Sequence, residues 1–91
     1  MKLYDAYVNN NKTYIKLGHC YGQYPFEILK QFAKNNEVKL YTERITDVRC
    51  VCDSQYKSCI HFFCTINNNV YAITDLTENQ FNILIKQSEG G

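Results

Sequence analysis

The sequence has no tryptophan, a single proline and no run of apolar residues long enough to span a membrane. A spanning helix needs about 20 predominantly apolar residues in succession. The N-terminal segment is also interrupted by Asp5 and Asn9 before the apolar core of a secretory signal could form. We therefore expect no membrane span and no secretory signal. The compartment that fits is the cytoplasm, where thiols stay reduced.

A strong charge of one sign is missing as well. The 91 residues carry 10 Lys and Arg against 9 Asp and Glu, a net charge of +1, and the two signs are interspersed. Binding to nucleic acid or to an anionic membrane usually needs a basic patch, so neither partner is expected. The apolar fraction of 45% argues against disorder. A chain of this length forms one domain, which we expect over residues 1–88 with a flexible tail over residues 89–91.

Two asparagine triplets predict the tips of two β-hairpins, because asparagine tolerates the left-handed backbone conformation of tight turns. For the first hairpin we expect a four-residue loop over residues 9–12. This register places Tyr7 opposite Tyr14 on one face of the sheet. It also places Asp5 opposite Lys16, and both are favourable cross-strand pairs.

The second triplet, residues 67–69, predicts the loop of another hairpin with one clearly apolar face. That register places His61 opposite Asp75. Cys64 falls on the apolar face, where we expect a core cysteine, as most free cysteines are buried.

The remaining pattern predicts two helices and further strands. Pro25 suits the first position of a helix, and the helical spacing of apolar residues fades at Asn35 and Asn36. Alternation predicts a strand over residues 37–45 and another over 47–52. A second helix follows a Thr77 cap, with its apolar residues docked on the sheet: Phe81, Ile83, Leu84 and Ile85. The order β-β-α-β-β-β-β-α is typical of an α+β fold, a small antiparallel sheet of hairpins with one or two helices packed on one face.

Four of the five cysteines lie in the stretch "CVCDSQYKSCIHFFC", residues 50–64. If "DSQYKS" forms the loop of a hairpin, Cys52 lies opposite Cys59. Cys50 then lies opposite His61. These four side chains share one sheet face, since residues two apart on a strand point the same way.

Three interpretations of these four residues are open. A zinc site would use Cys50, Cys52, Cys59 and His61, but on a flat sheet they form a rectangle of roughly 5 by 7 Å. Tetrahedral zinc needs sulfur atoms within about 4 Å of one another. A Cys52–Cys59 disulfide suits the spacing of opposed residues but not a reducing cytoplasm. We therefore favour reduced cysteines and no cofactor, with zinc and a disulfide as alternatives.

A catalytic arrangement is a further alternative. Cys20 lies in "GHCYG", which we expect to be a glycine-flanked loop just before the first helix, where a helix dipole favours the thiolate. A His61–Asp75 pair facing this thiol would supply a base and the acid that orients it. The order also resembles that of the papain-like and transglutaminase-like superfamily, with "IHFFCTINNNVYAITD" as the histidine and acid strands. The resemblance implies a cysteine hydrolase with Cys20, His61 and Asp75 as its catalytic residues.

The tyrosines suggest a different kind of function. Tyr7 and Tyr14, near Lys12 and Lys16, would lie on an exposed sheet face, and tyrosine is enriched at protein interfaces. We predict non-enzymatic binding of another protein, a host or cognate factor, and a homodimer is compatible with the same surface. Heavy use of Asn, Lys, Ile and Tyr indicates an AT-rich genome, as in many phages and mobile elements. Inhibition of a host defence system fits that origin.

Overall fold

The computed structural model describes residues 1–40, 44–65 and 69–89. Within these residues the chain forms five strands and two helices, in the order β-β-α-β-β-β-α. They are β1 (Lys2–Asn10), β2 (Thr13–Gly22), α1 (Pro25–Asn35), β3 (Thr46–Asp53), β4 (Ser58–Cys64), β5 (Val70–Thr74) and α2 (Glu78–Glu89). The strands build one antiparallel sheet in the spatial order β2-β1-β5-β4-β3. The expected α+β fold is confirmed.

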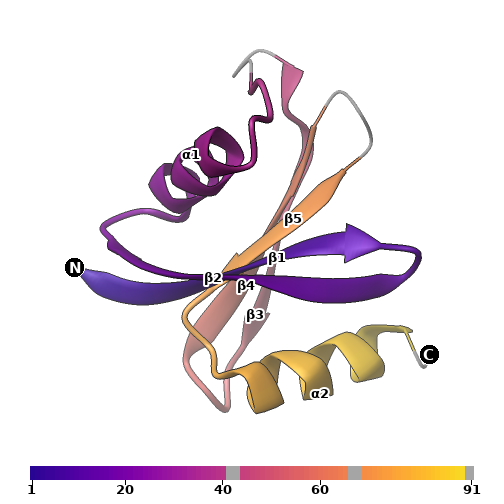
Figure 1. The fold of residues 1–91 in the computed structure, drawn as a ribbon. Helices are drawn as coiled ribbons and strands as arrows, with labels where there is room; N and C mark the ends of the chain where they lie inside the picture. Colours follow the sequence, from indigo (N-terminus) through magenta and orange to yellow (C-terminus); the bar gives the residue numbers. More distant parts are fainter. Residues whose placement is uncertain (41–43, 66–68, 90–91) are drawn as a thin grey trace.

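The two helices cover opposite faces of this sheet, which differs from the expected packing on one face (Figure 1). On one face α1 packs against strand residues that are two positions apart, because alternate side chains of a strand point the same way. The buried members of this cluster are Tyr4, Ala6, Ile28, Leu29, Phe32, Phe63, Tyr71 and Ile73. Its partly buried neighbours include Leu17 and Cys20 of β2.

The other face is covered by α2. The intervening residues of the same strands point there, and the buried cluster consists of Tyr7, Ile60, Phe62, Ala72, Leu76, Phe81 and Leu84. Phe81 is completely buried, whereas Ile83 stays 46% exposed. Ile83 therefore does not dock on the sheet as expected, although it lies within the predicted apolar stripe.

Local signals placed both helix starts correctly. Pro25 is the first residue of α1, and the helix ends at Asn35 with Asn36 as its C-cap. Before α2, the Thr77 hydroxyl accepts a hydrogen bond from the backbone N–H of Gln80 at 3.3 Å, while the Gln80 side chain accepts one from the Thr77 N–H at 3.0 Å. This reciprocal pair is a capping box, which satisfies backbone N–H groups at a helix start.

The described residues of the predicted strand over residues 37–45, which are 37–40 and 44–45, are not part of the sheet. Residues 38–40 have no regular secondary structure, and residues 41–43 lie outside the described residues. Val38 instead donates its backbone N–H to the Ala33 carbonyl at 2.8 Å, which closes the end of α1. The next strand, β3, begins at Thr46, so the alternation of apolar residues did not produce strand pairing in residues 37–40 or 44–45.

The first hairpin is tighter than expected. Asn11 and Lys12 both have positive φ, at 52° and 68°, and Asn10 pairs with Thr13. A two-residue turn of this kind matches the twist of a hairpin, so it replaces the four-residue loop. As a result Tyr7 lies opposite Lys16, not opposite Tyr14. The register then shifts at a bulge between Ala6 and Tyr7.

The second hairpin is also shifted, by two residues. Cys64 pairs with Val70, and the connection is closed by a hydrogen bond of 3.0 Å from the Thr65 N–H to the Asn69 carbonyl. Most of the predicted loop over residues 67–69 lies outside the described residues. His61 consequently lies opposite Ile73 and not opposite Asp75.

Candidate functional site

The tyrosine face predicted to bind another protein is covered by the chain's own C-terminal helix. Tyr7 is only 2% exposed and stacks on Phe81 of α2, with the ring centroids 3.9 Å apart. Tyr14 is half-buried and meets the edge of the same Phe81 ring at 5.5 Å. The prediction that Tyr7 lies exposed on a binding surface is therefore wrong, because α2 packs on its side of the sheet.

The two lysines of that predicted surface have different surroundings. Lys16 lies 3.7 Å from a carboxylate oxygen of Asp5 and 3.9 Å from one of Glu78, in the first turn of α2. Lys16 thus helps to hold the helix on the hairpin. Lys12 lies in the exposed turn, where its backbone N–H donates to the Asn9 side chain at 3.2 Å.

The three residues of the predicted catalytic triad are not brought together. Cys20 lies inside β2, not in a loop before α1, and its thiol donates to the Gln31 side chain of α1 at 2.7 Å. His61 lies on β4, three strand positions away, which corresponds to about 14 Å. Asp75 pairs with Lys2 at 3.4 Å. The predicted nucleophile therefore lies out of reach of the predicted base, and the site gives no support to a cysteine hydrolase.

The cysteine hairpin has the predicted register. Cys52 lies opposite Cys59 and Cys50 lies opposite His61, and all four belong to β3 and β4. Cys52 and Cys59 form a disulfide, with their Cα atoms 4.1 Å apart. The favoured interpretation, a fully reduced hairpin, is thus wrong for this pair. Cys50 keeps a free thiol, as do Cys20 and Cys64.

The sulfur atoms are closer together than the flat-sheet estimate allowed. The Sγ atoms of Cys50 and Cys52 are 3.4 Å apart, and those of Cys50, Cys52 and Cys59 all lie within 4.8 Å of one another. The His61 Nε2 lies 3.7 Å from the Cys50 sulfur. Three sulfur atoms therefore gather at one edge of the sheet, and the His61 imidazole lies beside one of them, outside the group that is mutually within 4.8 Å. Three cysteines and a histidine are ligands that suit zinc. The cluster can hold a metal ion, although the disulfide occupies two of its sulfurs.

His61 is suited to act as a neutral ligand. Burial lowers the pKa of its imidazole below the usual range, and the nearby Asp75 carboxylate only partly opposes this effect. Its Nδ1 is buried without a hydrogen-bond partner among the described residues. Because the other ring nitrogen faces the Cys50 sulfur, the lone pair of the imidazole can be directed toward the thiols.

A small hollow adjoins this cluster on the side of Cys59. It has a volume of about 120 Å³ and is lined by Lys2, Tyr4, Lys57, Ser58, Cys59, His61 and Asp75. Sequence reasoning did not find it, because it joins the start of β1 to the β3–β4 hairpin, which are far apart in the chain. Lys2 is paired with Asp75 at 3.4 Å, so the two lysines and one aspartate leave one net positive charge in the hollow beside Cys59.

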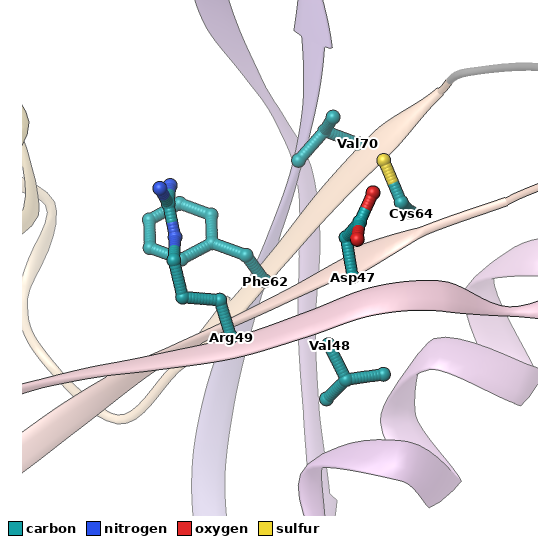
Figure 2. Close-up of a pocket in the computed structure, with 6 residues that line it drawn as sticks. All are labelled: Asp47, Val48, Arg49, Phe62, Cys64 and Val70. Carbon is teal, nitrogen blue, oxygen red and sulfur yellow. The ribbon is translucent and has the colours of Figure 1, made fainter.

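A larger hollow of about 440 Å³ lies on the α2 side of the sheet, away from the disulfide (Figure 2). There the Arg49 guanidinium lies over the Phe62 ring, 4.7 Å from its centroid. Cys64 lines this hollow and is half-buried, so it is less enclosed than the expected core cysteine. The charged side chains that line it, Asp47 and Arg49, have opposite signs, and no cluster of catalytic groups accompanies them in the described residues.

Large apolar side chains remain exposed where β1 begins and β2 ends. Met1 is 93% exposed, Leu3 43%, Tyr21 64% and Tyr24 58%. Leu3 and Tyr21 are directly paired across β1 and β2, and Tyr24 is the N-cap of α1. We call these four residues the end surface. The sequence does not reveal this surface, because the two glycines that flank Tyr21 predict a loop, whereas β2 continues to Gly22.

Comparison with family models, curated proteins and solved structures found no match to this chain. Neither helix in the described part of the chain has the length and apolar character needed to cross a membrane.

Proposed function

We propose that this protein is a non-enzymatic domain that binds another protein through the end surface. The observation that carries the proposal is the exposure of Met1, Leu3, Tyr21 and Tyr24 at one end of a small sheet. Exposed apolar side chains that occur singly are ordinary. Here Leu3 and Tyr21 are directly opposed across two strands, and Met1 and Tyr24 lie two and three residues from them along the chain. Tyrosine supplies a large contact area with few rotatable bonds, which suits an interface.

The charges near the end surface favour a protein over a nucleic acid. Lys2, between Met1 and Leu3, is paired with Asp75 at 3.4 Å. The whole chain carries a net charge of only +1, whereas nucleic-acid binding depends on clusters of unneutralised Lys and Arg. Inhibition of the bound protein, as by a phage factor acting on a host defence system, is part of this proposal and rests on chain size and composition.

A photo-crosslinking amino acid at position 21 tests the proposal. Expressed in its natural host, the Tyr21 variant should give one discrete adduct, because Tyr21 lies at the centre of the proposed interface. The matched control is Ile83, which is 46% exposed on α2 and should give none. An adduct at twice the chain mass would identify the partner as a second copy. Absence of an adduct at position 21, or equal adducts at both positions, would contradict the proposal.

A second candidate function is zinc binding by Cys50, Cys52, Cys59 and His61. The observation that favours it is the distance of 3.4 Å between the Cys50 and Cys52 sulfurs, with the third sulfur within 4.8 Å. Sulfur ligands of a tetrahedral zinc ion lie about 3.8 Å apart, given Zn–S bonds of about 2.3 Å. Native mass spectrometry of the fully reduced chain with one equivalent of Zn²⁺ should show one bound ion. An unchanged mass would exclude this function.

A further inference from the structure

We propose that the Cys52–Cys59 disulfide is a redox gate on this metal site. In the oxidised chain two of the four ligands are tied to each other; in the reduced chain Cys50, Cys52, Cys59 and His61 bind one zinc ion. This inference rests on the second candidate function and adds its regulation. Disulfides in reducing compartments are usually transient or redox-sensing, which is the role that this inference gives to the Cys52–Cys59 bond.

The hairpin holds the ligands in place whether or not the disulfide is formed. Cys52 and Cys59 are opposed residues of an antiparallel pair, and so are Cys50 and His61 two residues further along the strands. Backbone hydrogen bonds between β3 and β4 fix these pairs. Breaking the disulfide therefore frees two thiols without dispersing them, and a short movement of side chains can bring four ligands around one ion.

The hollow beside Cys59 gives a reductant access to the disulfide. Cys59 lines it together with Lys2, Lys57 and Asp75. Lys2 is paired with Asp75 at 3.4 Å, so the net positive charge of the hollow comes from Lys57, and positive charge stabilises an approaching thiolate. A small thiolate attacks the Cys59 sulfur, a mixed disulfide forms, and Cys52 leaves as a thiolate that takes up a proton. A second thiolate then attacks the sulfur of the reductant, which releases Cys59 as a thiolate and the reductant as its own disulfide. Two electrons pass to the protein, and two thiols are oxidised.

The free thiol of Cys50 is not placed to carry out this exchange itself. Attack on a disulfide requires the three sulfur atoms to lie nearly in line. The Cys50 sulfur lies 3.4 Å from the Cys52 sulfur. In a linear arrangement of the three sulfur atoms, the Cys50 and Cys59 sulfurs would therefore lie more than about 5 Å apart. They lie within 4.8 Å, so the three sulfurs form a triangle. A triangle suits a shared metal ion better than a chain of exchange steps.

His61 lies two residues beyond Cys59 on β4 and supplies the fourth ligand once its ring moves closer to the Cys52 and Cys59 sulfurs, because it lies outside the group of three sulfurs within 4.8 Å. Its Nε2 is 3.7 Å from the Cys50 sulfur, and its Nδ1 has no partner among the described residues. Zinc then releases the thiol protons as the thiolates form.

The gate is tested by comparing zinc affinity in the two redox states of the full-length chain. Oxidised protein and protein reduced with a phosphine, later removed, are titrated with Zn²⁺ against a chromophoric chelator and weighed by native mass spectrometry. The reduced chain should bind one ion. The oxidised chain should bind about 100-fold more weakly or not at all, because two ligands are removed. Adding a small-molecule disulfide to the zinc-bound chain should release the ion.

Substitution of single residues tests which side chains bind zinc, and a cysteine outside the site serves as the control. Cys59→Ser and His61→Gln should each weaken zinc binding by the reduced chain. Cys64→Ser, a free cysteine on the opposite sheet face, should leave it unchanged. Circular dichroism of each variant checks that the fold is retained. Equal effects of all three substitutions would overturn the assigned ligand set.

The two proposals fail in different ways. A reduced chain that binds no zinc contradicts the zinc-binding function itself. A chain that binds zinc equally well in both states contradicts only the gate and leaves zinc binding standing. Five alkylatable thiols after full exposure to a small-molecule disulfide would also contradict the gate, since no disulfide would then form.

Discussion

Tyr7 illustrates how one side chain can be well packed and still carry an unfavourable group. Its ring is buried and stacked on Phe81, but its hydroxyl has no hydrogen-bond partner among the described residues. A buried polar group without a partner costs about 1–3 kcal/mol. The ring therefore stabilises the fold by packing against α2, whereas the buried hydroxyl destabilises it.

Tyr7→Phe should stabilise the protein by about 1 kcal/mol, because it removes the unpartnered hydroxyl and keeps the stacked ring. Urea unfolding at pH 7 followed by circular dichroism measures the change in the free energy of unfolding. Tyr21→Phe is the matched control: Tyr21 is 64% exposed, and the substitution should have no effect. A destabilised Tyr7→Phe protein would show that the hydroxyl has a partner after all.

The same substitution should change the response to alkaline pH. Burial, then the carboxylates of Asp5 and Glu78, raise the pKa of Tyr7 above its usual value of 10.0. The unfolded chain loses the Tyr7 proton first, so the stability due to this group is present below about pH 10 and is lost as pH rises further. Tyr7→Phe should lose less stability than the wild type between pH 9 and pH 11. Burial raises the pKa of Tyr71 as well, but Tyr71 is present in both proteins.

At the scale of the elements, the β3–β4 hairpin is the one most dependent on a covalent bond. It lies at the edge of the sheet, and most residues of β3 are exposed. Its disulfide joins residues seven positions apart. Closing a loop of this size removes chain entropy from the unfolded state, which is worth about 2.5 kcal/mol in the simplest treatment.

Reduction of the disulfide should therefore lower the free energy of unfolding by up to about 2.5 kcal/mol. Urea titrations with and without a phosphine reductant measure the difference, with EDTA present so that metal does not compensate. The Cys52→Ser/Cys59→Ser double variant should match the reduced wild type and should not respond to the reductant. Identical unfolding curves for oxidised and reduced wild type would contradict this expectation.

At the scale of the whole molecule, the sheet depends on a helix on each side. Within α2, Phe81 is fully buried and Leu84 is 9% exposed. Burial of each such side chain is worth about 1.5–3 kcal/mol. The two together therefore supply a large part of the 5–15 kcal/mol that stabilises a typical domain. Without α2, the aromatic face of Tyr7, Tyr14 and Phe62 would be open to solvent.

A chain ending at residue 76 should thus bind a hydrophobic dye and self-associate, or fail to unfold cooperatively, because its aromatic face has lost its cover. Size-exclusion chromatography and dye fluorescence measure both effects. A chain ending at residue 89 keeps α2 and should behave like the full-length protein. If the shorter chain stayed monomeric with a cooperative unfolding transition, α2 would not be needed to cover this face.

The sequence by itself determined the features that depend on neighbouring residues. Pro25 and the Thr77 cap set the starts of the two helices, and the spacing of cysteines around one short loop set the pairs Cys52–Cys59 and Cys50–His61. Each of these depends on turn or capping geometry within a few residues. The α+β class followed from the same local patterns.

Tertiary structure alone decided which face of the sheet each helix covers and how the hairpins are registered. Because successive side chains of a strand point to opposite faces, the sequence shows that Tyr7 and Ala6 lie on different faces of β1. Either face was compatible with cover by a helix. The packing of Phe81 buried Tyr7, and the two-residue turn at Asn11 placed it opposite Lys16. Tyr21 of β2, in contrast, stays 64% exposed. A local pattern defines two faces of a strand, but only the path of the whole chain determines what lies against each of them.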